Sequence, residues 1–306
     1  MNNGNLCFGV NTDSFFGIGF GLVGNNDPRA LELKFNRYFE LLNEYRIQAV
    51  EINTEIEQLS PGFLGKIIAP IIKSSDVKAN IKSVSVHLPY LQLNPSSLLE
   101  EYRKLSVDYI IRVINACREL EALNISVGRF VLHLTSEFED SIMFFPIGEE
   151  DKKALIVSAI NQARKSMADI LEKTGLNPGM FALENLEVFP FDYLYPIVKE
   201  YNISICFDIG HWGLNGFMPL EFIEKFKLEN ISEIHIQDMV LERQGLRITV
   251  RKEHRALGDG ILRVDDFFNY LKDKKFGGSL IIENRSEKDL IKSLEYIKSK
   301  NLIHIK

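Results

Sequence analysis

The sequence predicts an α/β fold, the (β/α)8 or TIM barrel, in which eight parallel strands are surrounded by helices. Short β-rich runs alternate along the chain with amphipathic helical stretches, and this order favours parallel pairing. The chain has 306 residues, 45% of them hydrophobic, and no low-complexity linker divides it, so we expect a single domain over residues 1–306. A doubly wound open sheet is the structural alternative, because a strand count read from one sequence can be wrong by one or two.

Eight short runs have the apolar, β-rich composition of buried strands. In chain order they are 6–10, 49–53, 83–88, 129–134, 180–185, 203–208, 232–238 and 279–284. Between them, segments 96–120 and 151–175 carry apolar residues at helical spacing. The second segment ends in Gly175, the position at which a helix cap is expected. Strands and helices therefore follow one another as they do in a barrel.

The charge and the cysteines exclude several classes of protein. A net charge of −6 and a pI near 5.7 give no global attraction to nucleic acid or to acidic membranes, although a local basic patch could still bind phosphate. Cys7, Cys117 and Cys206 form no C-x-x-C pair, which argues against a disulfide scaffold and against a cysteine zinc ribbon. No run approaches the ~18 apolar residues of a membrane span, and the N-terminus lacks the features of a signal peptide. We expect a soluble protein of the cytoplasm.

Ionisable residues gather where the predicted strands end. In a barrel all of these positions lie on one face and point toward one pocket. A single histidine beside an apolar strand is more often a satisfied core residue. Several imidazoles and carboxylates in one pocket would each lose hydration, and a divalent cation is the usual way to relieve that cost. The residues concerned are His87, His133, Glu184, Asp208, His211, His235 and Glu283.

The ligand types narrow the choice of metal only in part. One imidazole with three carboxylates, namely His235 with Glu184, Asp208 and Glu283, suits Mn²⁺, Mg²⁺ or Co²⁺. Adding His87 and His133 would give a more nitrogen-rich site that suits Zn²⁺. A site with two metals bridged by Glu184 is compatible with the same residues.

Two further segments allow more than one interpretation. The loop after the seventh strand is basic and is either a solvated surface hairpin or an anion clamp for a phosphorylated substrate. The segment 19–24 matches G-x-G-x-x-G, but it stands apart from its strand and no acidic strand end follows at the usual distance. We interpret it as a flexible loop over the pocket and expect no nucleotide cofactor. The basic residues of the later loop are Arg243, Arg247, Arg251, Lys252 and Arg255.

Taken in order, the strand-end motifs resemble those of the xylose isomerase-like TIM barrels, which include sugar isomerases and epimerases and the endonuclease IV type of AP endonuclease. The resemblance extends from about residue 6 to residue 285. The motifs that carry it are VHLPYLQLN (86–94), VLHL (131–134), ALEN (182–185), FDIGH (207–211), IHIQD (234–238), HRALGDG (254–260) and IIEN (281–284).

The resemblance implies particular metal ligands. Glu184, Asp208, His235 and Glu283 match the main metal site, and His87 and His133 with the shared Glu184 match the second site of the endonuclease branch. In that branch a third metal uses the histidine matched by His211 together with a later Asp-x-His pair. Here that pair reads Lys252-Glu253-His254, so Lys252 replaces the aspartate and argues against a third metal.

Our first functional hypothesis is a metal-dependent isomerase or epimerase of a small sugar or sugar phosphate. The metal would chelate neighbouring substrate oxygens, and Glu184 and Glu283 would move the proton as a base and acid pair through an enediolate. His211 and His254 would hydrogen-bond the developing oxyanion, and Lys252 and Arg255 would contact a phosphate.

Two other functions remain as alternatives. One is a metal-dependent phosphoester hydrolase of the endonuclease IV type, with Glu184 bridging two metals. His87 and His133 favour it, whereas Lys252, the acidic pI and the lack of an extended basic surface count against nucleic acid as a partner. The other is a binding protein that keeps the pocket without turnover. The residues leave the identity of the sugar, the physiological metal and the oligomeric state open.

Overall fold

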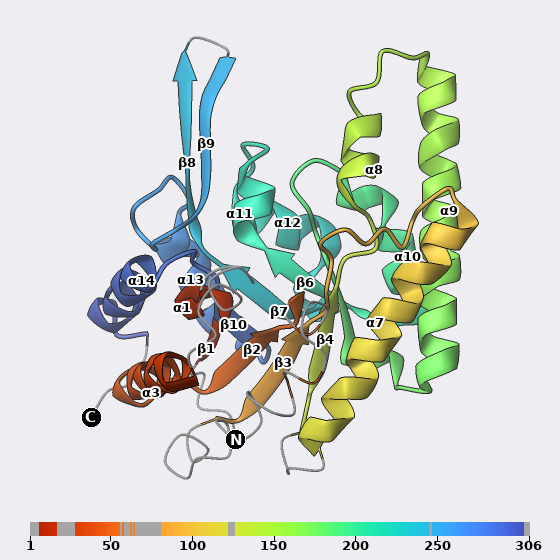
Figure 1. The fold of residues 1–306 in the computed structure, drawn as a ribbon. Coiled ribbons are helices and arrows are strands. Elements are labelled where there is room, and N and C mark those ends of the chain that lie inside the picture. The colour runs from red at the N-terminus through yellow and green to blue at the C-terminus, as the bar shows by residue number, and fades with distance from the viewer. Residues whose placement is uncertain are drawn as a thin grey trace.

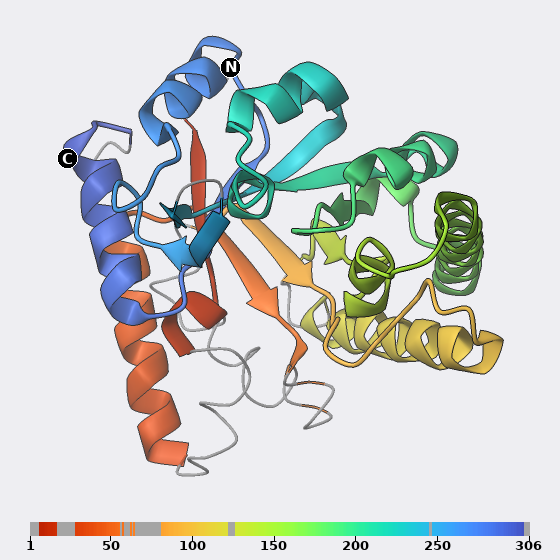
Figure 2. The same cartoon turned by 90° about the horizontal axis from the view of Figure 1, so that it is seen from above.

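The computed structural model describes residues 6–16, 28–55, 57, 62, 64, 81–121, 126–244 and 247–302. Within them, eight parallel strands form a closed barrel in the order β1-β10-β7-β6-β5-β4-β3-β2 (Figure 2). The predicted fold class is therefore confirmed, because β1 pairs with both β2 and β10 and leaves no open edge. The barrel strands are β1 (Cys7–Asn11), β2 (Ala49–Asn53), β3 (Ser83–His87), β4 (Arg129–Leu132), β5 (Phe181–Glu184), β6 (Ser204–Asp208), β7 (Ile231–Ile236) and β10 (Ser279–Ile282).

Helices surround the ring of strands (Figures 1 and 2). The predicted helix over 151–175 is confirmed as α9, which ends at Thr174 with Gly175 in the left-handed conformation as its cap. The predicted helix over 96–120 is α7, and it begins at Glu100. The described helices are α1 (Asp13–Phe16), α3 (Pro28–Glu44), α7 (Glu100–Glu121), α8 (Glu137–Ile142), α9 (Glu149–Thr174), α10 (Tyr195–Tyr201), α11 (Ile209–Gly213), α12 (Pro219–Phe226), α13 (Val264–Asp273) and α14 (Glu287–Ser299), with short 3₁₀ turns at Pro178–Met180, Phe191–Tyr193 and Leu228–Asn230.

An antiparallel hairpin extends from the barrel after β7 (Figure 1). It consists of β8 (Asp238–Gln244) and β9 (Arg247–Arg255), in the segment for which the sequence predicted a basic surface hairpin or an anion clamp. The backbone is thus a hairpin, whereas the side chains of Arg243, Arg247 and Arg251 lie outside what the structure describes. The glycine motif at 19–24 also lies outside the described residues.

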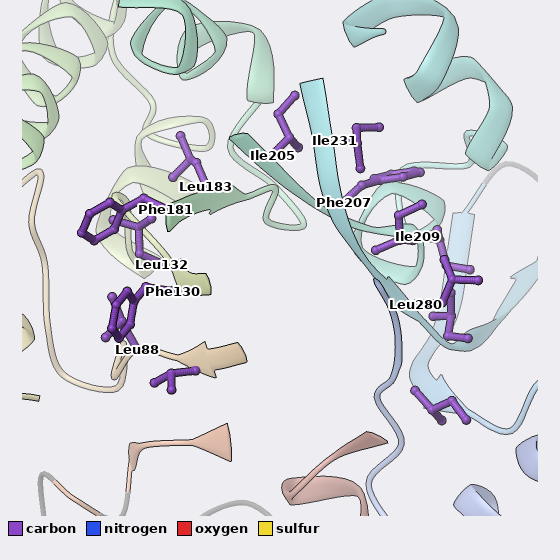
Figure 3. Packing of buried hydrophobic residues seen from close by; sticks show 14 of the residues in the cluster. Leu88, Phe130, Leu132, Phe181, Leu183, Ile205, Phe207, Ile209, Ile231 and Leu280 are labelled. Atoms are coloured by element: carbon purple, nitrogen blue, oxygen red, sulfur yellow. The ribbon is translucent and has the colours of Figure 1, made fainter. Parts of the chain in front are cut away.

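The strands place alternate side chains on opposite faces, and the outward face builds the core. Phe130, Phe181, Leu183, Phe207 and Leu280 point away from the barrel axis into the layer beneath the helices (Figure 3). Phe207 stacks on Phe222 of α12 with ring centroids 4.0 Å apart. This apolar layer holds the strand ends, and therefore the site, in fixed positions.

The inward face is only partly apolar. A small buried cluster inside the barrel consists of Val131, Ala182 and Cys206. The acidic residues Glu51 and Glu233 are also buried there. None of the described helices is long and apolar enough to span a membrane. That residues 1–306 form one domain stays a prediction.

Candidate metal centre

A cavity of about 720 Å³ opens where the barrel strands end at their carboxyl termini. Asp208 and His235, the two predicted metal ligands that do not line it, are both 0% exposed and lie against the lining residues. The structure thus brings together side chains from strands that are far apart in the sequence. The predicted site residues that line the cavity are His87, His133, Glu184, His211, His254 and Glu283.

Glu184, Asp208, His235 and Glu283 form a group that we call the quartet, and each offers one ligand atom within 4.8 Å of the others. Nδ1 of His235 is its centre, since it lies 3.1 Å from Oε1 of Glu184, 3.3 Å from Oε2 of Glu283 and 3.9 Å from Oδ2 of Asp208. Oε2 of Glu283 is buried and has no hydrogen-bond partner. One imidazole, three carboxylates and an unsatisfied buried oxygen fit a divalent cation.

The surrounding polar groups fix the orientation of Asp208. Its Oδ1 accepts a hydrogen bond of 2.7 Å from the backbone N–H of His211, and its Oδ2 accepts one of 2.7 Å from Nε2 of Gln237. The side chain of Asn185 bonds the Asp208 backbone on both its N–H and its carbonyl. Burial raises the pKa of Asp208 to about 7, and the charges of Glu283 and Glu184 act in the same direction. A cation would remove that penalty.

Glu184 connects the quartet to a second group of possible ligands. Its Oε1 faces His235, whereas its Oε2 lies 3.0 Å from Nε2 of His87 and 2.9 Å from Nε2 of His133. Nδ1 of His87 lies 3.0 Å from the carbonyl of Leu88, so a proton on Nδ1 would leave Nε2 as the ligand atom. Burial lowers the pKa of His87, but the hydrogen bond and charge of Glu184 outweigh it and raise the pKa to about 10. The geometry is that of a carboxylate able to bridge two cations.

Glu51 lies behind the quartet and was missed by sequence reasoning. Its Oε2 is 3.0 Å from Nε2 of His235, and its Oε1 accepts a hydrogen bond of 2.6 Å from Nδ2 of Asn11. A proton held on Nε2 by Glu51 leaves the lone pair of Nδ1 directed at the other three members of the quartet. The only signal in the sequence was an acidic residue in the middle of the apolar run 49–53.

Glu233 lies deeper in the barrel and was also missed. It is 0% exposed, neither of its oxygens has a hydrogen-bond partner, and Nη1 of Arg129 is 3.6 Å from its Oε2. Burial raises the pKa of Glu233 to about 8, and the charge of Glu51 adds to the effect. Burial therefore favours the protonated form of Glu233.

His211 and His254 take different places at the cavity. Nε2 of His211 points toward the quartet, 3.8 Å from Oε1 of Glu184 and 3.9 Å from Oδ2 of Asp208. Its Nδ1 faces two acids that the sequence did not single out as ligands, at 3.2 Å from Oε1 of Glu187 and 3.6 Å from Oε2 of Glu253. Nδ1 of His254 lies 3.0 Å from the backbone carbonyl of Glu283.

Among the residues that the structure describes, Arg285 is the arginine that lines the cavity, and no lysine lines it. Lys252 is exposed and Arg255 is half-buried, and neither is part of the lining. Nη2 of Arg285 lies 2.6 Å from Oε1 of Glu253, so its charge is already paired. The predicted contacts of Lys252 and Arg255 with a substrate stay predictions.

Fold and site together define a (β/α)8 barrel with a carboxylate and imidazole pocket at the carboxyl ends of its strands. A family model described as a xylose isomerase-like TIM barrel matches residues 69–300. The chain belongs to this family, as its motifs indicated.

Among its relatives, an uncharacterised protein of Methanocaldococcus jannaschii is 30% identical over 70% of this chain and 69% of its own length. A probable endonuclease 4 of Mycoplasma mycoides is 26% identical over 67% of this chain and 69% of its own length. The crystal structure of a D-tagatose 3-epimerase-like protein superposes with a TM-score of 0.68 at 24% identity and covers 96% of this chain and 97% of that one, which shows a shared fold. The relatives named as enzymes thus differ in the reaction that their names indicate.

Proposed function

We propose that the protein is a divalent-metal-dependent isomerase or epimerase of a small, uncharged sugar. The observation that carries the proposal is the convergence of Glu184 and Glu283, from β5 and from the end of β10, on Nδ1 of His235. Two carboxylates on either side of one cation position can remove a proton from a substrate carbon and return it. The name of the epimerase-like structural neighbour supports the same reaction class.

In the proposed reaction a hydroxy-carbonyl substrate loses the proton of the carbon between its two oxygens and passes through an enediolate. A bound divalent cation would supply the Lewis acidity that makes this C–H acidic. In the metal-free chain, burial raises the pKa of Glu283, but the charge of His235 outweighs it and holds the pKa below its usual value, so Glu283 is ionised. A cation bound at Nδ1 of His235 would favour the ionised form of Glu283 in the same way. Nε2 of His211, which faces the quartet, would hydrogen-bond the developing oxyanion.

The charge of the cavity favours an uncharged substrate over a phosphate ester. Besides Glu184 and Glu283, the acids Glu137, Asp140 and Glu187 line the cavity, and the one arginine of the described lining, Arg285, is paired with Glu253. A phosphate placed beside these three acids would meet like charges from them. A polyhydroxylated sugar can instead hydrogen-bond the carboxylates and pack against the ring of Tyr90, which lies beside that of His133.

A metal-dependent phosphoester hydrolase is the second candidate. Its supporting observation is that Glu184 presents one oxygen to the quartet and the other to His87 and His133, the arrangement of a two-metal centre. The name of the Mycoplasma mycoides relative agrees with it. The acidic lining disfavours it, because a nucleic-acid backbone requires basic contacts.

The test is an activity panel of ketoses, aldoses, their phosphates and an abasic-site duplex, with Mn²⁺ or Zn²⁺ added. Reactions run in D₂O should place deuterium on the carbon that loses its proton, and Glu283→Gln should abolish this exchange while metal stays bound. Glu137→Gln, which changes an exposed acid of the same cavity, is the matched control and should keep turnover. Cleavage of the duplex without any sugar reaction would replace the first candidate by the second, and metal binding without any turnover would leave a binding protein.

A further inference from the structure

A second cavity, of about 810 Å³, lies at the opposite end of the barrel from the quartet, and we call it the amino-terminal cavity. Its lining includes Arg129, the first residue of β4, and Ser232, near the start of β7. Gly277 and Gly278, which precede β10, also line it. In (β/α)8 barrels the chemistry takes place at the carboxyl ends of the strands, so the proposed proton transfer does not use this cavity.

Arg129 reaches from β4 to β7 in this cavity, although β5 and β6 lie between those strands in the barrel. Its Nη1 donates a hydrogen bond of 3.0 Å to the backbone carbonyl of Ser232. Its Nε is buried without a hydrogen-bond partner, and Glu233, 3.6 Å from Nη1, accepts no hydrogen bond. A guanidinium has five N–H donors, and 20% of this side chain is exposed, so Arg129 can still bind an anionic acceptor.

Three lysines line the same cavity, and two of them have a left-handed backbone. Lys227 caps the end of α12 with φ of 70°, and Lys275, two residues after the end of α13, has φ of 54°. Helices usually place glycine at such positions. Lysine in a conformation that favours glycine is expected where its side chain has a function. The third lysine is Lys274, whose Nζ lies 5.7 Å from the ring centroid of Tyr270.

The charge of the amino-terminal cavity is opposite to that of the cavity at the quartet. Four basic residues line it, against the two acids Glu224 and Glu229. Among the described residues, no carboxylate forms an ion pair with any of the three lysines. Tyr270 and Leu228 add half-buried apolar surface to the lining. Unpaired positive charge beside apolar side chains suits an organic anion.

We propose that the amino-terminal cavity binds a small phosphorylated molecule. Its phosphate group would contact Arg129, Lys274 and Lys275, because a phosphate has acceptor oxygens for a guanidinium and for two ammonium groups. Its uncharged part would pack against Tyr270. Since the two cavities lie at opposite ends of the barrel, the inference does not depend on which reaction the quartet performs.

Calorimetry on the metal-free full chain tests the proposal with phenyl phosphate, inorganic phosphate and phenol. Without metal, no phosphate can bind to ions at the quartet. The double variant Lys274→Gln/Lys275→Gln should bind phenyl phosphate at least about tenfold more weakly than the wild type, because it loses two charged donors. Phenyl phosphate should bind more tightly than inorganic phosphate, and phenol should bind more weakly than either.

The matched control is Lys272→Gln/Lys288→Gln, which removes the same charge from exposed lysines outside the lining. It should bind phenyl phosphate as the wild type does. All four lysines are exposed, so thermal unfolding of both double variants should match that of the wild type.

NMR locates the bound molecule independently of the calorimetry. The amide resonances of Gly277 and Gly278 should shift when phenyl phosphate is added to the wild type and should stay in place in Lys274→Gln/Lys275→Gln. Equal affinity in the wild type and this variant, or an equal loss in the control, would overturn the proposal even if the quartet proved active on sugars. Inorganic phosphate binding as tightly as phenyl phosphate would contradict the contact with Tyr270.

Discussion

Nε2 of His235 lies 3.0 Å from Oε2 of Glu51, and neither side chain is exposed to solvent. The two residues are 184 positions apart in the sequence and belong to β7 and β2. Asn11 holds the other oxygen of Glu51, so the carboxylate has little freedom to turn. This relationship gives His235 a defined tautomer and directs Nδ1 toward the quartet.

Replacing Glu51 by glutamine should weaken metal binding without removing a ligand. The amide can present its NH₂ group to Nε2 of His235 and would then favour the tautomer whose proton lies on Nδ1. We expect the affinity of the quartet for Mn²⁺ or Zn²⁺ to fall by about 10- to 100-fold. Calorimetry should show this loss and NMR of the imidazole nitrogens the change of tautomer. An unchanged affinity would mean that Glu51 packs inside the barrel but does not orient His235.

Glu184 is predicted to support two ion positions at once. Glu184→Gln should therefore weaken both the quartet and the group of His87 and His133, whereas His133→Asn should affect only the second group. The expected loss for the first variant exceeds about 100-fold in metal affinity, because a direct ligand is removed rather than its support. Ion counting on both variants checks the difference. Equal counts in the two would contradict the bridging role.

The stability of the metal-free protein should fall as the pH rises from about 4 to about 7, in part because of Asp13. Burial raises the pKa of Asp13 from its ordinary value of 3.8 to about 7, and the charge of Glu283 adds to the effect. In this window the unfolded chain has lost the proton that the folded chain still holds, so the free energy of unfolding decreases with pH. Asp13→Asn should remove roughly 3 kcal/mol of that decrease.

Urea unfolding at pH 4.5 and pH 7.5 measures this difference. The matched control is Asp108→Asn, which changes an exposed ion pair with Lys173. Its free energy of unfolding should change between the two pH values by as much as that of the wild type. A parallel pH dependence in Asp13→Asn and the wild type would show that Asp13 titrates normally in the folded protein.

Arg103 should be important for the packing of α7 against α9. It is 3% exposed and donates to Glu100, to Ser166 at 3.0 Å and to Asp169 at 2.8 Å. Arg103→Met would leave the Ser166 hydroxyl and two carboxylates without this donor, and we expect the melting temperature to fall by roughly 4 °C or more. Lys104→Met removes an exposed neighbouring charge and should change it little. Similar melting curves for both variants would contradict the structural role of Arg103.

Much of the fold and of the quartet could be predicted because their signals are local. Each of the eight barrel strands coincides with an apolar run, and Gly175 ends α9 at the predicted position. Parallel strands with short carboxyl-terminal motifs place their end residues on one face of a barrel. The strand ends predicted that Glu184, Asp208, His235 and Glu283 gather on one face, and the structure places one ligand atom of each within 4.8 Å of the others. Their roles as metal ligands stay predictions.

The other side chains of the site could not be predicted, because their positions depend on contacts between segments that are distant in the sequence. Glu51 sits within an apolar run, and only the closed barrel brings it to His235 on a strand across the interior. Glu253 reaches His211 from β9, in which the next residue, His254, has a left-handed backbone with φ of 54°.

By itself, then, the sequence determined the order of strands and helices and the face on which the ionisable residues gather, because side-chain alternation and strand ends are properties of neighbours in the chain. Only the tertiary structure decided which carboxylate orients His235, that Arg285 rather than Lys252 lines the cavity, and that Glu187 and Glu253 meet at His211. The physical reason is that these contacts join side chains from distant segments, and their distances depend on the closure of the barrel and the path of its loops.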